Sequence, residues 1–141
     1  GKKMTKKSTS KTGNQYQDWG VKMLTEMYPG CVCHNQKSVA KFIPFLNRYI
    51  SQRNDILGCI DVICIAPIQR PLFIQFTAHK SFTEKLKELA KIPWSLNHCD
   101  VQVWMKRAPG RTEIRSLKLE GMEYVLVPCG EINKRKFVPN A

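Results

Sequence analysis

Long hydrophobic segments are missing from this sequence. No apolar run reaches the ~18 to 20 residues that a membrane-spanning helix needs, and no hydrophobic stretch follows the lysine-rich start, as a secretory signal would require. The sequence also contains no internal repeat. We therefore expect neither a membrane span nor a membrane partner, and we expect a cytoplasmic, intracellular location.

Acidic residues are also scarce. Among 141 residues, 11 Asp and Glu stand against 23 Lys and Arg, which gives a formal net charge of +12. The hydrophobic fraction of 43% is enough for one buried core and argues against global disorder. A folded domain this basic usually meets a polyanion, and nucleic acid is the commonest one in a cell. Two alternatives stay open, namely basic charge that serves solubility alone and a basic assembly protein that binds other proteins.

Several enzyme motifs are absent as well. The sequence has no Gly-x-x-x-x-Gly-Lys phosphate loop, no dinucleotide fingerprint and no paired His-Glu metalloprotease motif. Cys59 and Cys64 lie in apolar runs, where reduced cysteines act as small hydrophobic residues. A zinc site is disfavoured because Cys-x-Cys is tighter than the usual ligand spacing. The residues considered for it are Cys31, Cys33, His34, His98 and Cys99.

The pattern of apolar residues predicts helices and strands in alternation. Helices are expected over 15–28 and over 81–92, the second with Ser81 as its N-cap. Strands are expected over 31–34, 56–66, 72–77, 101–105, 112–119 and 125–127. Residues 41–50 fit either a strand or a short helix. The order predicts an α/β domain with a central mixed sheet and helices on its faces, spanning 13–130 between a flexible basic arm (1–12) and a loosely held basic tail (131–141).

Asp61 is an unusual residue within its predicted strand. It interrupts a run of Ile, Val and Cys, and burying a carboxylate there is unfavourable by several kcal/mol unless it is paired or binds a metal. Gln75 and Thr77 are two residues apart on the next strand, so both point to one face. A hairpin would bring the three polar groups together. The alternative is that all three lie at a wet strand end.

The segments around Asp61 and Gln75 resemble those of a known superfamily. Residues 54–61 (NDILGCID) and 73–77 (FIQFT), with the order of elements around them, are similar to the PD-(D/E)XK nucleases. Within that superfamily the archaeal and viral Holliday-junction resolvases are most similar, especially a phage-type group with N-D-x-x-G-x-x-D and Q-x-T motifs. The resemblance covers 13–119. It implies a restriction-endonuclease-like fold, a homodimer, an origin in a virus or mobile element, and a metal-dependent endonuclease acting on structured or branched DNA.

The resemblance also assigns roles to individual residues. Asp61 matches the metal-binding Asp, Gln75 stands in place of the Glu of E-x-K, and Thr77 stands in place of its Lys. The amide Gln17 stands where the first helix often carries a glutamate, with Asp18 beside it. Asp61 and Gln75 are therefore the expected ligands of Mg²⁺ or Mn²⁺, held weakly because an amide lacks the charge of a carboxylate.

Neighbouring residues offer replacements for the missing charges. Asp55, preceded by Asn54, would restore a second carboxylate, and His79 or Lys80 would supply a proton-handling or cationic group. The expected phosphate contacts are Lys80, Lys85, Lys87, Lys106, Arg107 and Arg111. Trp94 and Trp104 are expected to pack in the core. The alternative function is a catalytically inactive nuclease fold that binds DNA or RNA, which the amide and hydroxyl substitutions favour.

Overall fold

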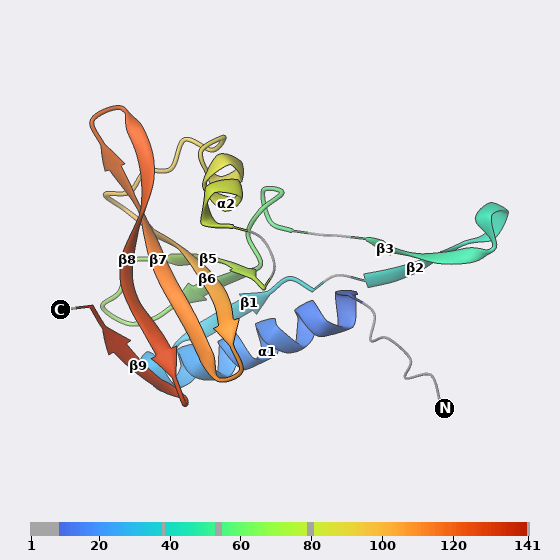
Figure 1. Ribbon diagram of the computed structural model, residues 1–141, viewed down its shortest axis with the longest axis horizontal. Helices are drawn as coiled ribbons and strands as arrows, with labels where there is room; N and C mark the ends of the chain where they lie inside the picture. The colour runs from blue at the N-terminus through green and yellow to red at the C-terminus, as the bar shows by residue number, and fades with distance from the viewer. Residues whose placement is uncertain (1–8, 38, 53–54, 79–80, 141) are drawn as a thin grey trace.

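The computed structural model describes residues 9–37, 39–52, 55–78 and 81–140 (Figure 1). Within these ranges two α-helices, α1 (Thr9–Met27) and α2 (Phe82–Leu89), accompany nine strands. The strands are β1 (Val32–Asn35), β2 (Val39–Ile43), β3 (Arg48–Gln52), β4 (Val62–Ile65), β5 (Leu72–Thr77), β6 (Asp100–Ala108), β7 (Arg111–Glu120), β8 (Glu123–Asn133) and β9 (Lys136–Pro139). Neither helix in these ranges is long and apolar enough to cross a membrane.

Seven strands form one mixed sheet in the order β1-β4-β5-β6-β7-β8-β9. Every neighbouring pair is antiparallel except β5 and β6, which run parallel and are joined through α2. A parallel pair needs such a crossover because the chain must return to the end of the sheet at which the first strand began. The prediction of a mixed α/β domain is confirmed. Strands β2 and β3 form a separate hairpin that extends away from the sheet in Figure 1.

Each helix packs over its own hydrophobic core. Met23 and Leu24 of α1 lie with Val62, Ile74 and Trp104 on one face of the sheet. A second buried cluster contains residues of α2 and of the opposite face, namely Ile60, Phe82, Leu89, Val101, Val103 and Leu117. Alternation along β5 sends Ile74 and Phe76 to the α1 core and Gln75 to the other face.

Local patterns predicted several elements correctly. β5 has the predicted bounds, and the Ser81 side chain caps α2 by accepting a hydrogen bond from the Glu84 N–H at 3.3 Å. Trp104 is fully buried, and Trp94 packs against Phe73 with ring centroids 5.3 Å apart. The core roles predicted for both tryptophans are confirmed.

The predicted ends of the domain were wrong. Residues 131–133 belong to β8 and residues 136–139 form β9, so this segment is not a loose tail. Pairing with β9 satisfies backbone groups that β8 would otherwise present at an open edge, and Ile132 is fully buried. At the other end α1 begins at Thr9, inside the range predicted as a flexible arm, while residues 1–8 lie outside the described ranges.

The segment left undecided, 41–50, contains most of the β2–β3 hairpin. Its turn is the short 3-10 helix Pro44–Leu46, followed by Asn47 in the left-handed region at φ 50°. The Asn47 N–H donates to the Pro44 carbonyl at 3.1 Å. Proline and asparagine have these roles in turns because one presets φ and the other tolerates the left-handed conformation.

Candidate functional site

Asp61 stands immediately before β4 and is only 6% exposed. Its backbone N–H donates to the Ile74 carbonyl at 2.9 Å, and its Oδ2 accepts from the Phe76 N–H at 2.8 Å. These two bonds bracket Gln75 on β5. The prediction that the hairpin brings Asp61 and Gln75 together is confirmed.

The protonation of Asp61 reflects its surroundings. Burial raises the pKa of this carboxyl to about 7, and the charge of Asp55 and a hydrogen bond with it act in the same direction. The hydrogen bond from Phe76 and the charge of Lys85 oppose that rise. Asp55 therefore lies at Asp61, as predicted from the sequence. A buried carboxyl with a raised pKa beside a second carboxyl favours a bound proton or a bound cation.

Gln75 is 1% exposed, and its side-chain amide donates a hydrogen bond to helix α2. Its Nε2 donates to Glu88 Oε2 at 2.8 Å. Because a carboxylate only accepts hydrogen bonds, this contact fixes which end of the amide faces α2. The buried Oε1 atom of Gln75 then has no hydrogen-bond partner in the part of the chain that the structure describes.

Gln17 is a second buried amide, and it lies on the other side of the sheet. It lies on the buried stripe of α1, one turn before Gly20, whose Cα packs against the ring of Phe76. Its Oε1 is also buried without a partner among the described residues. Unpartnered buried amide oxygens are unfavourable and are the kind of atom that a ligand satisfies.

Helix α2 adds two charged groups that the sequence motifs do not include. Lys85 and Glu88 are three residues apart and share a helix face, with Lys85 Nζ 3.6 Å from Glu88 Oε2. Lys85 is only 3% exposed, although it is a lysine on a short helix. Its expected role as an exposed phosphate contact is therefore corrected, because the crossover between β5 and β6 turns this helix face onto the sheet.

The thiol of Cys59 interacts electrostatically with the same charged groups. Burial raises the pKa of Cys59 to about 11, the charges of Glu88, Asp55 and Asp61 act in the same direction, and Lys85 opposes them. Cys59 belongs to the second core, which also contains Phe82 and Leu89 of α2. The charged groups of α2 and those at Asp61 therefore act on one buried side chain.

Sequence reasoning missed Glu88 because its role depends on the packing of α2. One signal was present in the helix: Lys85 occupies the apolar stripe defined by Phe82 and Leu89. A lysine in such a stripe is buried only when a carboxylate accompanies it. Searching for that partner one turn away would have led to Glu88.

The other predicted site residues lie in different surroundings from one another. Thr77 is buried at the end of β5, on the same face as Gln75 by alternation. Asp18 is exposed, forms an ion pair with Lys37 at 2.8 Å and accepts a hydrogen bond from Asn35 at 3.0 Å, so it belongs to the surface. The candidates outside the described ranges are Asn54, His79 and Lys80.

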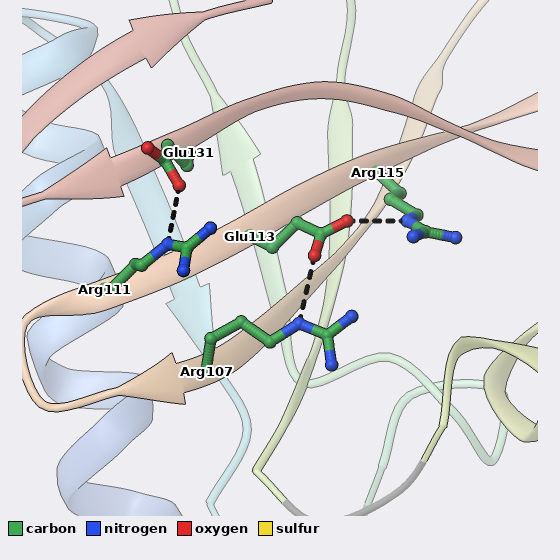
Figure 2. A network of polar contacts seen from close by, with 5 residues as sticks. All are labelled: Arg107, Arg111, Glu113, Arg115 and Glu131. Atoms are coloured by element: carbon green, nitrogen blue, oxygen red, sulfur yellow. Dashed lines mark hydrogen bonds and ion pairs between the residues drawn. The ribbon is translucent and has the colours of Figure 1, made fainter.

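The predicted basic surface is partly neutralised by glutamates. Lys87 and Lys106 are exposed, whereas Arg107 pairs with Glu113 at 3.0 Å and Arg111 pairs with Glu131 at 2.9 Å (Figure 2). Arg115, which the sequence did not single out, also pairs with Glu113 at 2.8 Å. Burial alone would raise the pKa of Glu113, but hydrogen bonds from Arg115 and Arg107 outweigh it and lower that pKa.

The arginines of this network also border α2. The guanidinium carbons of Arg115 and Arg107 lie 4.0 Å and 5.3 Å from the centroid of the Phe82 ring. Phe82 is the first residue of α2, so the network flanks the helix that carries Lys85 and Glu88. Guanidinium groups over an aromatic face are held in place by cation–π attraction.

Three cysteines form a separate group. The Sγ atoms of Cys31, Cys33 and Cys64 lie within 4.8 Å of one another, and Cys64 belongs to the core on the α1 side. His34, His98 and Cys99, which were considered for a zinc site, are not part of this group. Thiols favour soft metals, whereas Mg²⁺ favours oxygen ligands.

Comparison of the chain with protein-family models, curated proteins and solved structures finds no match. The resemblance to the nuclease superfamily therefore stays a prediction.

Proposed function

We propose that this protein is a metal-dependent endonuclease that cuts structured or branched DNA in the manner of Holliday-junction resolvases. One observation carries the proposal. The buried carboxylate of Asp61 lies beside Gln75, whose Oε1 has no partner among the described residues, and it is accompanied by Asp55 and Lys85. A carboxylate in such a place is unfavourable for stability, and a metal site gives a reason to keep it.

The arrangement of elements supports the proposal. The order of α1, the antiparallel strands β1, β4 and β5, the crossover helix α2 and the parallel strand β6 is the order on which the resemblance depends. Asp61 precedes the middle strand of that group of three and Gln75 lies on the third. We infer that the domain has a restriction-endonuclease-like fold around these strands.

The residues present fit a hard divalent cation. Mg²⁺ and Mn²⁺ prefer carboxylate and amide oxygens, and Asp61 and Gln75 offer both kinds of atom. Glu88 would add negative charge near the site, because its Oε2 lies 2.8 Å from the Gln75 amide nitrogen, and Lys85 Nζ lies 3.6 Å from the same oxygen. When bound, the metal polarises a phosphoryl oxygen and lowers the pKa of a coordinated water.

The remaining groups would act on the phosphate and the water. Lys85 is a buried ammonium whose charge lowers the pKa of Asp61, and in the proposed site it would supply positive charge from α2 in place of the lysine that the superfamily carries on its strand. The hydroxyl of Thr77 can donate or accept a hydrogen bond at the end of β5. Exposed Lys87 and Lys106 would bind neighbouring phosphates and make the affinity sensitive to salt.

The experiment compares binding and cleavage on defined substrates. A labelled four-way junction, a matching duplex and a single strand are incubated with Mg²⁺, Mn²⁺ or EDTA. Three proteins are used: the wild type, Asp61→Asn, and Glu123→Gln as a matched carboxylate-to-amide control at an exposed position. We expect metal-dependent cleavage of the junction by the wild type and the control, and none by Asp61→Asn.

The second candidate function is a nuclease fold that binds DNA or RNA without cutting. The amide at Gln75 and the hydroxyl at Thr77 favour it, since neither carries the charge of the residue it replaces. Salt-sensitive binding with no cleavage under either metal would support this function over the first. A chain that binds none of the three substrates would contradict both.

The two-fold symmetry of a resolvase reaction gives a further expectation. Cutting two strands symmetrically requires two copies of the site, so a homodimer is part of the proposal. Light scattering with and without the junction measures the mass directly. A complex containing one chain per junction would contradict symmetric cutting.

A further inference from the structure

The β2–β3 hairpin starts and ends at the candidate site. Just before it, the Gln36 N–H donates to the Asp61 carbonyl at 2.8 Å. Just after it, the chain reaches Asp55, which hydrogen-bonds with Asp61. Figure 1 shows the hairpin extending away from the seven-stranded sheet. The base of the hairpin therefore lies next to Asp61, and its turn lies away from the sheet.

The hairpin presents aromatic rings to solvent. Phe42 and Tyr49 are cross-strand partners with ring centroids 5.1 Å apart, and Tyr49 is 72% exposed. Phe45, in the turn, is 88% exposed. A two-stranded hairpin alone is only marginally stable in water. Exposed rings on such a projection are typical of a surface that becomes covered when a partner binds.

The charge of this region favours a nucleic acid as that partner. Between Glu26 and Asp55 the chain contains no Asp or Glu. The same segment contains four basic residues, Lys37, Lys41, Arg48 and Arg53, of which Lys37 forms an ion pair with Asp18. Aromatic rings stack on bases while cations bind the phosphates between them, and proteins that bind single-stranded nucleic acid combine these two features.

We propose that the β2–β3 hairpin is a DNA-binding arm whose exposed rings stack on unpaired bases at a branch point. The inference rests on the proposed function and narrows its substrate. In a continuous duplex each base is stacked between its neighbours, so a ring must first displace one, which is unfavourable. At a branch point bases unstack more readily, so the arm selects the branched structure, and the base of the arm adjoins Asp61.

The test separates stacking from charge. The double variant Phe45→Ala/Tyr49→Ala removes the two most exposed rings of the hairpin, and Arg48→Gln removes one positive charge. Met122→Ala, an equally exposed apolar residue in the β7–β8 turn, is the matched control. Affinities for a four-way junction and for the matching duplex are measured in EDTA, which prevents cleavage. A 2-aminopurine base at the branch point reports stacking through its fluorescence.

We expect the double variant to bind the junction about 10- to 100-fold more weakly than the wild type, as the loss of base–aromatic stacking predicts. Its duplex affinity should stay within about twofold of wild type, since duplex binding depends mainly on phosphate contacts. Arg48→Gln should weaken both substrates and reduce the salt dependence. Met122→Ala should match the wild type, and 2-aminopurine fluorescence should change only when the rings are present.

Each failure has its own signature. A wild type that binds neither substrate would overturn the proposed function and the arm with it. A wild type that binds DNA, together with a double variant of equal junction affinity, would overturn the arm alone. Loss of a dimer in the double variant, measured by light scattering without DNA, would overturn the arm in favour of contact with a second copy of the chain.

Discussion

Replacing Asp61 by Asn should make the protein more stable at neutral pH while removing its proposed activity. Asn keeps the size of the side chain and an oxygen that can accept the hydrogen bond from Phe76. It also carries N–H groups that can donate to Asp55, and it has no charge to bury. A stabilising substitution at a buried acid is expected where the acid is kept for function and opposes folding.

The magnitude follows from the protonation of Asp61. Burial, reinforced by Asp55, raises its pKa from 3.8 to about 7. The folded chain therefore keeps a proton that the unfolded chain releases between about pH 4 and pH 7, so wild-type stability falls as pH rises through this window. At 1.36 kcal/mol per pH unit, the ionised form is disfavoured by at most about 4 kcal/mol above pH 7. An asparagine side chain does not ionise, so the Asp61→Asn variant does not have this penalty.

Urea denaturation of both proteins at several pH values measures the effect. The gap in unfolding free energy should be near zero below pH 4, open between pH 4 and 7, and reach at most about 4 kcal/mol at pH 8, which is about 14 °C in melting temperature. Mg²⁺ should stabilise the wild type and narrow the gap at pH 8, and Glu123→Gln should show no such gap. An Asn variant that is less stable than wild type at pH 8, or a gap of equal size at pH 4 and pH 8, would refute the reasoning.

Three further predictions concern other residues of the site and core. Glu88→Gln should slow cleavage about 10- to 100-fold, as the loss of a partner group at a metal site commonly does. Its junction affinity in EDTA should stay unchanged, and a cleavage rate equal to that of the wild type would show that Glu88 is not part of the site. Gly20→Ala should lower the free energy of unfolding by about 1 to 3 kcal/mol, because its Cβ would lie 2.4 Å from ring carbons of Phe76; urea denaturation measures this, and unchanged stability would contradict the packing. Cys59, whose pKa burial raises to about 11, should react with iodoacetamide at pH 8 far more slowly in the folded chain than in urea, as followed by mass spectrometry; equal rates would show that the thiol is accessible.

Local interactions explain why part of the fold could be predicted. β5 is a short, mainly apolar run bounded by Pro71 and Ala78. The Ser81 cap accepts its hydrogen bond from the N–H of Glu84, only three residues further along the chain. Such signals involve residues that are close in sequence, so they are visible without the rest of the chain. The same holds for Asp61, which its apolar neighbours in sequence mark as unusual.

Pairing between distant segments explains what the sequence left open. β9 is a strand of only four residues, one of them a proline, and pairing with the open edge of β8 makes it a strand. The β2–β3 hairpin contains Pro44 and a mixed apolar pattern that fits a helix as well. In both places cross-strand partners decide the conformation, because β structure depends on contacts more than on intrinsic preference.

The candidate site divides in the same way. The sequence by itself marked Asp61 as an unusual carboxylate and placed Gln75 and Thr77 on one face of their strand, because alternation along strands and the unfavourable burial of a carboxylate are properties of short segments. Only the tertiary structure decided that Lys85 and Glu88 complete the group. Their place depends on the crossover that lays α2 over β5, and the chain must close that long connection before a helix side chain can meet a strand.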